Sequence, residues 1–333
     1  MTKRTIQIPP PPAELPSAEH IDVEAVLDSY LNGEIDLICV LGPTASGKTR
    51  YAVGLCRHID TLLRSRGINA HAEILSADSR QVYRGMTIGT GKDLGEYEEI
   101  PCHLIDIVDA GEKYDIYRFQ HDFEKAYKGI VERGCIPVLC GGSGLYIEAA
   151  TCGYDLPDVP PDPELRAELE KQSTEELIER LASLKPLHNS TDYDTRKRLI
   201  RALEIAIYEE QHPINRNSFL PKSTYYIGTL VTREERNARI DRRLDARLEE
   251  GMVDEIRKLM EGDPENGRPG VSAEDLIYYG LEYKFVTSYV TGALSYDEMR
   301  TQLATAIHQF AKRQMTWFRG MERKGMTIHW TEV

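Results

Sequence analysis

The chain has 333 residues, 41% of them hydrophobic and 29% charged, so it can bury the core of one large domain or two ordinary ones. Its net charge of −13 argues against a protein coated by nucleic acid, although a local basic groove is compatible with it. No apolar run reaches membrane-spanning length, and the six cysteines follow no C-x-x-C spacing. We expect a cytoplasmic protein with reduced thiols and no membrane segment, and we take it to be a monomer.

Residues 1–20 are predicted to form a flexible arm, because Pro9–Pro12 and Pro16 favour polyproline conformations. A short amphipathic helix is expected from Asp22 to Leu31, at the start of the first part of the core, 21–158.

Strand-like and helical segments alternate from residue 35 to about residue 150. The expected strands are 35–41, 72–76, 103–107 and 136–140, and the expected helices are 48–66 and 115–133. This alternation predicts an α/β fold with a parallel sheet covered by helices on both faces. Because ligands of such sheets bind at the carboxyl ends of the strands, the loops 42–48, 77–92 and 141–146 should converge.

The loop after the first predicted strand has the pattern G-x-x-x-x-G-K-[ST], between a strand and a helix. In that context the backbone N–H groups and the helix N-terminus attract phosphates, so a P-loop NTPase-like sheet is expected. Lys48 would reach the terminal phosphate, and the Thr49 hydroxyl would bind Mg²⁺. The residues predicted to hold two or more linked phosphates are Gly42, Pro43, Thr44, Ala45, Ser46, Gly47, Lys48 and Thr49.

Asp78 directly follows the second predicted strand and should therefore lie near the P-loop. Residue types leave two roles open: capping a helix or holding Mg²⁺ through water, which is the commoner use, or acting as a general base beside the phosphates. The glycine turn at 141–146 is likewise either a ligand site or a tight strand-to-helix connection.

After the proline-rich break at 157–163 the chain becomes helical and charged. We predict a helical insertion at 159–222, followed by completion of the core at 223–333. A strand at 224–231 should return to the sheet, and 327–330 should form an edge strand. The helices expected in these regions are 164–171, 174–184, 194–210, 234–249, 253–261, 273–289 and 296–320.

Basic residues cluster in three of these helices. Steps of three and four place Arg236, Arg239, Arg243 and Arg247 on one helical face, which either supplies cations to phosphates or forms ion pairs with interleaved acids. Cations also alternate with aromatic residues in 311–319, which suits either stacking of single-stranded nucleic acid or packing of Trp317 and Phe318 in the core.

Together these stretches resemble the tRNA dimethylallyltransferase (isopentenyltransferase) family. The matching segments are GPTASGKT (42–49), SADSRQVYRGMTIGTGK (76–92), PCHLIDI (101–107), IPVLCGGSGLY (136–146), RLIRALE (198–204), REERNARIDRR (233–243) and AKRQMTWFR (311–319). The sequence departs from the family at Thr90-Gly91-Lys92-Asp93, where the family has T-A-K-P, and at Ser143, where it has threonine.

The resemblance implies Mg²⁺-dependent transfer of a dimethylallyl group from dimethylallyl diphosphate to N6 of adenine 37, beside the tRNA anticodon. It implies three catalytic residues: Asp78 as the base, with Thr44 and Arg243 acting on the departing diphosphate. The residues expected to contact the anticodon stem-loop are Asp78, Ser79, Arg80, Gln81, Ser143, Arg198, Arg201, Lys312 and Arg313. The alternatives are prenylation of free AMP, a P-loop kinase of a small molecule and a non-catalytic RNA-binding protein.

Overall fold

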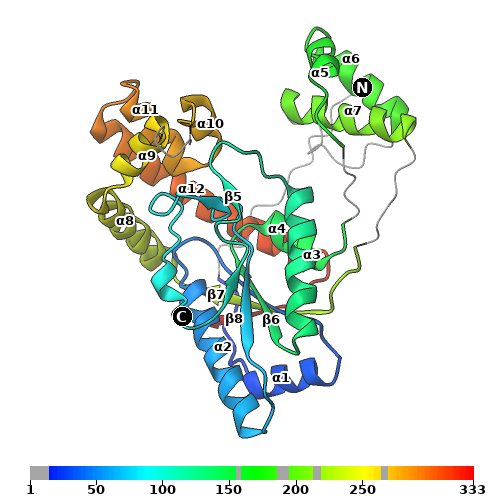
Figure 1. The fold of residues 1–333 in the computed structure, drawn as a ribbon, viewed down its shortest axis with the longest axis vertical. Coiled ribbons are helices and arrows are strands. Elements are labelled where there is room, and N and C mark those ends of the chain that lie inside the picture. The colour runs from blue at the N-terminus through cyan, green and yellow to red at the C-terminus, as the bar shows by residue number, and fades with distance from the viewer. Residues whose placement is uncertain (1–14, 155–158, 186–194, 213–218, 264–268) are drawn as a thin grey trace. The chain divides into compact units, whose positions relative to one another are not determined.

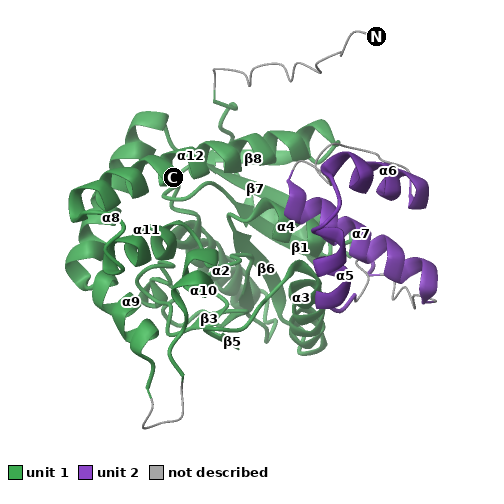
Figure 2. Cartoon of the chain, turned by 90° about the horizontal axis from the view of Figure 1, so that it is seen from above, with its two compact units in different colours: residues 1–152, 221–333 green, residues 153–220 purple. Residues whose placement is uncertain are grey.

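The computed structural model describes residues 15–154, 159–185, 195–212, 219–263 and 269–333 (Figure 1). The chain divides into two compact units, residues 1–152 with 221–333 and residues 153–220 (Figure 2). The second unit therefore begins before residue 159 and ends before residue 222, the boundaries expected for the helical insertion.

A six-stranded parallel sheet forms the centre of the first unit, in the order β4-β2-β6-β1-β7-β8. Its strands are β1 (Leu37–Leu41), β2 (Ala72–Ser76), β4 (Cys102–His103), β6 (Ile136–Gly141), β7 (Thr224–Leu230) and β8 (Ile328–Glu332). The central strands are buried on both faces, which is why they read as continuous apolar runs. The predicted return of the chain to the sheet and the predicted edge strand are both confirmed.

Helices cover both faces of the sheet. On one face α2 (Lys48–Ser65) and α1 (Val23–Leu31) share a core with Ile38, Val40 and Ile74. α3 (Ile116–Glu132) and α4 (Gly144–Thr151) lie on the other face (Figure 1). The glycine turn at 141–146 thus leads directly into a helix.

A helical layer follows β7 and leads to β8. It contains α8 (Arg233–Glu250), α9 (Met252–Glu261), α10 (Ala273–Tyr278), α11 (Leu281–Val290) and α12 (Tyr296–Arg323). In α12 the buried side chains recur at steps of three and four, from Met299 through Leu303 and Ile307 to Phe318, so one stripe faces the core.

Two predicted elements are wrong in extent. The strand expected at 103–107 ends at His103, because Leu104 (φ 67°) and Asp106 (φ 55°) adopt left-handed backbone conformations that a strand excludes. Two further strands, β3 (Tyr83–Arg84) and β5 (Val108–Asp109), pair with each other in a separate sheet. The helix expected at 273–289 is divided at Gly280 (φ 138°) into α10 and α11.

The second unit contains α5 (Pro163–Leu169), α6 (Thr174–Leu184) and α7 (Arg196–Gln211). These helices share a core of leucines, among them Leu169, Leu177 and Leu203. The unit thus buries apolar side chains of its own.

Residues 1–14 of the expected arm lie outside the described residues, but its end is fixed. The Glu19 backbone N–H donates to Trp330 O at 2.7 Å, and its carboxylate lies 2.7 Å from His329 Nδ1 on β8. All six cysteines carry free thiols. Within the described ranges, no helix is long and apolar enough to cross a bilayer.

Candidate active site

The P-loop connects β1 to α2 at the centre of the sheet. Two of its residues adopt left-handed conformations, Ala45 (φ 60°) and Gly47 (φ 83°), and Gly47 directly precedes α2. Gly42 is required by packing, since a Cβ there would lie 2.1 Å from Thr229 Oγ1 and 2.5 Å from Ser46 Oγ. The Ser46 and Thr229 hydroxyls are hydrogen-bonded at 2.6 Å, which ties the loop to β7. Ser46 therefore stabilises the P-loop by linking it to the sheet.

Lys48 begins α2, and its side chain is half-buried at the P-loop. Burial lowers the pKa of its ammonium group, while Cys140 and Asp78 raise it and Arg243 lowers it further. Burial raises the pKa of the Cys140 thiol to about 12, so this neighbour is neutral at pH 7. The influence of Asp78 and Arg243 on Lys48 indicates that these three charged groups share one site.

A cavity of about 790 Å³ opens above the P-loop. One side consists of the loop and the start of α2, and the other of Arg239 and Arg243 from α8. Arg239 is paired with Glu235 at 2.9 Å, and Arg243 pairs with Asp93. The cavity therefore faces two guanidinium groups and the P-loop lysine, a surrounding suited to an anion with several charges.

Arg247 lies one turn further along α8. It is 14% exposed, and its Nη1 lies 3.9 Å from Glu282 Oε1 on α11. Burial lowers the pKa of Arg247 and raises that of Glu282, and each partly offsets the effect of burial on the other. Gly91 (φ 62°) leaves room for this arginine, because a Cβ there would lie 1.6 Å from Arg247 Nη2.

Asp78 leaves the carboxyl end of β2 toward this cluster. Its Oδ1 accepts the backbone N–H of Arg80 at 2.9 Å, which closes a local turn. The neighbouring Ser79 N–H donates to Ser143 Oγ at 3.2 Å, and Ser143 N–H donates to Ala77 O at 3.3 Å. The predicted convergence of the three loops is thus confirmed, with Asp78, Ser79 and Ser143 beside the P-loop.

Gln314 of α12 joins two of these loops. Its Oε1 accepts the Thr44 backbone N–H at 2.8 Å, and its Nε2 donates to Gly142 O at 2.8 Å. The side chain is only 8% exposed, and its hydrogen bond to Gly142 O is shielded from water. The P-loop and the loop after β6 are therefore held at a fixed separation by one amide group.

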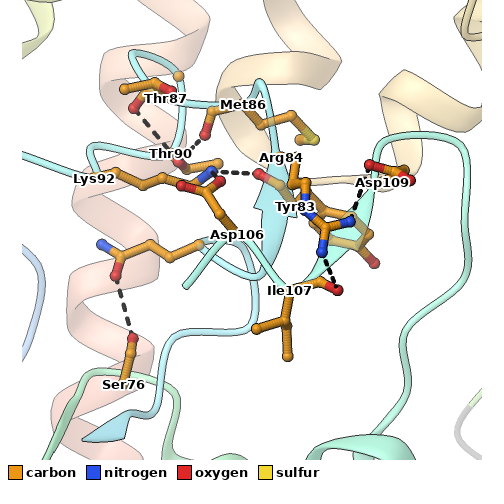
Figure 3. Close-up of polar contacts among 12 residues, drawn as sticks. Ser76, Tyr83, Arg84, Met86, Thr87, Thr90, Lys92, Asp106, Ile107 and Asp109 are labelled. Atoms are coloured by element: carbon orange, nitrogen blue, oxygen red, sulfur yellow. Dashed lines mark hydrogen bonds and ion pairs between the residues drawn. The ribbon is translucent and has the colours of Figure 1, made fainter. Parts of the chain in front are cut away.

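The segment after Asp78 is held in place by contacts of buried side chains (Figure 3). Gln81 is buried, accepts from Ser76 Oγ at 3.2 Å and donates to Gly91 O at 3.2 Å. Buried Lys92 contacts both Asp106 and Tyr83 O, as Figure 3 shows. These contacts link both ends of the segment and hold Gly91 near α8.

From α9 a carboxylate fixes the turn within this segment. Glu255 accepts the backbone N–H groups of Thr87, Ile88 and Gly89 at 2.9, 2.7 and 3.0 Å. Tyr283 of α11 donates its hydroxyl to the same carboxylate at 2.6 Å.

Comparisons with known proteins identify the family of this chain. A model of the IPP transferase family matches residues 81–321. tRNA dimethylallyltransferase 2 of Porphyromonas gingivalis is 54% identical over 301 residues, which cover 89% of this chain and 94% of that protein. The chain belongs to the bacterial tRNA dimethylallyltransferase family.

Other relatives agree with this assignment. tRNA dimethylallyltransferase 2 of Bacteroides fragilis is 52% identical over 304 residues, 90% of this chain and 94% of that protein. The crystal structure of the full-length tRNA isopentenylpyrophosphate transferase of Bacillus halodurans superposes with a TM-score of 0.59, at 32% identity and 89% coverage of both chains. Like these relatives, the chain is a prenyltransferase of the α/β class.

The residues that the family resemblance associates with tRNA occupy several environments. Lys312 and Arg313 are exposed on α12, whereas the amide of Gln81 is buried and already hydrogen-bonded. In the second unit Arg201 contacts the buried carboxylate of Glu204 and donates to Val159 O at 2.8 Å. Arg201 therefore has a structural role within its own unit.

The aromatic residues of the 311–319 segment divide between core and surface. Phe318 is buried, with its ring centroid 6.4 Å from that of Trp330. Trp317 is 40% exposed, lies against Gly144 and donates its indole N–H to Glu148 at 3.1 Å. The core alternative thus holds for Phe318, and Trp317 keeps one face at the surface.

Sequence reasoning did not single out Arg239, Gln314 or Glu96 as site residues. The helical spacing had placed Arg239 on the face of Arg243, which was the available signal. Gln314 belongs to the AKRQ segment but gave no sign of its hydrogen bonds. Glu96, in the short 3₁₀ helix Leu94–Glu96, lines the cavity with no recognisable motif around it.

Proposed function

We propose that this prenyltransferase transfers the dimethylallyl group of dimethylallyl diphosphate to N6 of adenine 37, next to the anticodon of tRNA, and releases diphosphate. The observation that carries the proposal is the placement of a phosphate-binding loop, two arginines and one carboxylate around a single site. The 54% identical P. gingivalis protein is named for this transfer, which supports the same assignment here.

The diphosphate binds in the cavity above the P-loop. The loop's backbone N–H groups, Lys48 and the arginines of α8 surround the oxygens on which negative charge grows as the C1–O bond breaks. Thr44, whose backbone is fixed by Gln314, lies at the start of the loop and places its hydroxyl by the departing group. Arg243 exchanges its pairing with Asp93 for the diphosphate when the donor binds.

The nucleophile is a weak one, because the lone pair of an exocyclic amine is delocalised into the purine ring. Asp78 accepts the N6 proton as the new C–N bond forms, so the positive charge that the attack builds on nitrogen is removed. Its second role, in the turn with Arg80, keeps the carboxylate directed at the site.

Mg²⁺ suits the oxygen donors at this cavity. The Thr49 hydroxyl and the Glu96 carboxylate both line it, and hard oxygen ligands are those that Mg²⁺ prefers. When bound there, the ion would neutralise charge on the diphosphate oxygens.

The adenine must leave its stack to reach Asp78, which favours the anticodon loop over a duplex. We assign Ser79, Arg80 and Ser143, which lie on the loops beside Asp78, to contacts with the RNA, and the exposed Lys312 and Arg313 add positive charge on α12. Arg198 on α7 is assigned to tRNA as well. The buried Gln81 shapes the part of the site that receives the adenine, and Arg201 stabilises the second unit.

The free thiols suit a reducing cytoplasm, and we take the active species to be a monomer.

The test is incubation of the purified protein with dimethylallyl diphosphate, Mg²⁺ and either unmodified tRNA or AMP, followed by mass spectrometry of the nucleosides. We expect N6-dimethylallyladenosine from tRNA and none from AMP. Product from AMP alone would assign the protein to adenylate prenylation. In a parallel incubation that also contains ATP, consumption of ATP with the prenyl donor untouched would assign it to the kinases.

A further inference from the structure

A second group of reactive side chains lies at the end of the sheet opposite the P-loop, where the strands begin. It comprises His71, Glu73, His103 and Cys135, and it lies around the amino ends of β2 and β6. Because all strands of this sheet run parallel, their amino ends are remote from the carboxyl ends where the proposed transfer takes place. None of these residues has a part in that reaction.

The register of the strands brings the group together. His71 and Glu73 are two residues apart along one strand direction, so their side chains point to the same face. His71 O accepts the Ile136 N–H at 2.9 Å, and Ala72 pairs with Ile136, so Cys135 lies beside His71. Since this placement rests on backbone pairing, it persists when side chains rotate.

The ligand atoms come within reach of one ion when the exposed His71 ring rotates. His71 Nε2 lies 3.2 Å from Glu73 Oε1, and Cys135 Sγ lies 3.6 Å from Nδ1 and 3.8 Å from Nε2 of His71. Because the sulfur is nearly equidistant from the two ring nitrogens, it faces the ring, and the ring must turn for one nitrogen to share an ion with it. The bond lengths of a tetrahedral zinc site place neighbouring nitrogen, oxygen and sulfur ligands roughly 3.3–3.7 Å apart. One ligand atom from each of the three residues lies within 4.8 Å of the others.

The neighbours of Glu73 leave room for an ion. Its carboxylate is 3% exposed, Arg133 Nη2 lies 2.9 and 2.7 Å from its two oxygens, and His103 Nε2 lies 2.6 Å from Oε2. A carboxylate offers about four lone-pair directions, so Arg133 and His103 can stay bound while Oε1 takes a metal. Such partners orient metal ligands in many sites. His71 is 48% exposed and gives an ion access from solvent.

We propose that His71, Glu73 and Cys135 form a Zn²⁺ site with water in the fourth position. A thiolate, an imidazole and a carboxylate form a ligand set typical of zinc, and an open position is normal when three protein ligands are present. Binding converts the Cys135 thiol to a thiolate, and the released proton passes to solvent. The ion would join the start of β2 to the start of β6 and stabilise the folded state, because the unfolded chain lacks this arrangement.

The test uses Co²⁺ as a spectroscopic substitute for Zn²⁺ in the purified full-length chain. We expect a thiolate-to-cobalt charge-transfer band that saturates at one equivalent and disappears when Zn²⁺ is added. Cys135→Ser and His71→Ala should abolish the band. Cys152→Ser and His121→Ala, which alter a partly exposed cysteine and an exposed histidine elsewhere, should retain it.

A thermal melt provides the second measurement. Zn²⁺ should raise the Tm of the wild-type chain and of both control variants, and leave His71→Ala unchanged; that substitution is at an exposed side chain and should not impair folding. The proposal is overturned if the wild type shows no thiolate band, or if Zn²⁺ raises the Tm of His71→Ala as much as that of the wild type. In either case Glu73 is a buried anion satisfied by Arg133 and His103 alone. Neither result bears on the prenyl transfer.

Discussion

Asp78 serves the site through two different properties, its hydrogen-bonding oxygen and its basicity. Replacement by asparagine keeps an oxygen that can accept the Arg80 N–H but removes the base. We predict that Asp78→Asn and Asp78→Ala both lower kcat for prenyl transfer by about 10²–10⁴-fold, the usual contribution of a general base, and leave tRNA affinity nearly unchanged. Single-turnover rates and filter binding measure the two effects. Transfer near the wild-type rate in either variant would exclude Asp78 as the base.

Only some of the arginines of α8 line the cavity. We predict that Arg239→Ala and Arg243→Ala each weaken use of dimethylallyl diphosphate by about 10–100-fold in kcat/KM, the effect of losing a charge-assisted hydrogen bond. Arg242 is the matched control, since its side chain is 70% exposed and it does not line the cavity. Equal losses of tRNA affinity in Arg243→Ala would show instead that this arginine grips the RNA.

Lys48 should make donor binding sensitive to alkaline pH. Burial lowers the pKa of its ammonium group, so the cation that attracts the diphosphate is lost at a lower pH than for an ordinary lysine. We predict that the affinity for inorganic diphosphate falls as pH rises through this lowered pKa, as measured by calorimetry. Lys48→Arg should remove the dependence, because a guanidinium stays protonated. An unchanged alkaline limb in Lys48→Arg would contradict this role.

Two departures from the family pattern, Gly91 and Asp93, meet the same arginines. Asp93 pairs with Arg243, and Gly91 provides the space that Arg247 occupies. An alanine at position 91 would clash with the arginine, so the glycine and the position of Arg247 belong together. The two departures thus change what Arg243 and Arg247 contact, but both arginines stay beside the site.

At the scale of elements, α12 acts as a spacer between the donor and acceptor loops. We predict that Gln314→Ala lowers kcat by about 10–100-fold, because the partly buried Thr44 N–H and the buried Gly142 O lose their partner, at a cost of about 1–3 kcal/mol for the buried group. The exposed Gln302 on the same helix is the control. KM for both substrates should change less than kcat, and a pure loss of stability with normal kcat would refute the spacer role.

Local elements could be predicted from the sequence, whereas contacts between residues far apart in the chain could not. The P-loop could be predicted because its pattern depends on neighbouring residues, and the central strands because burial on both faces makes them continuously apolar. The strand at 103–107 was wrong because left-handed residues turn the backbone after His103 and the Lys92–Asp106 contact holds the following segment in place. Gln314 lies 270 residues from Thr44, so only the folded chain shows their contact.

At the scale of the whole molecule, a net charge of −13 coexists with local positive surfaces. We predict that Kd for tRNA rises steeply with salt, since phosphate contacts release counterions, with log affinity falling linearly against log salt. Lys312→Ala with Arg313→Ala should flatten that slope without changing it for diphosphate alone. Titration by fluorescence anisotropy at several ionic strengths measures it. A tRNA affinity independent of salt would contradict an RNA-binding surface of this kind.

Transfer in a single site requires that departure of the diphosphate and prenylation of the adenine be coupled. The direct measurement is the ratio of diphosphate released to adenine modified, with labelled dimethylallyl diphosphate and unmodified tRNA. We predict one diphosphate for each modified adenine in the wild type, and the same ratio at a rate about 10²–10⁴-fold lower in Asp78→Asn. Diphosphate released without modified adenine, or modification near the wild-type rate in Asp78→Asn, would contradict this coupling.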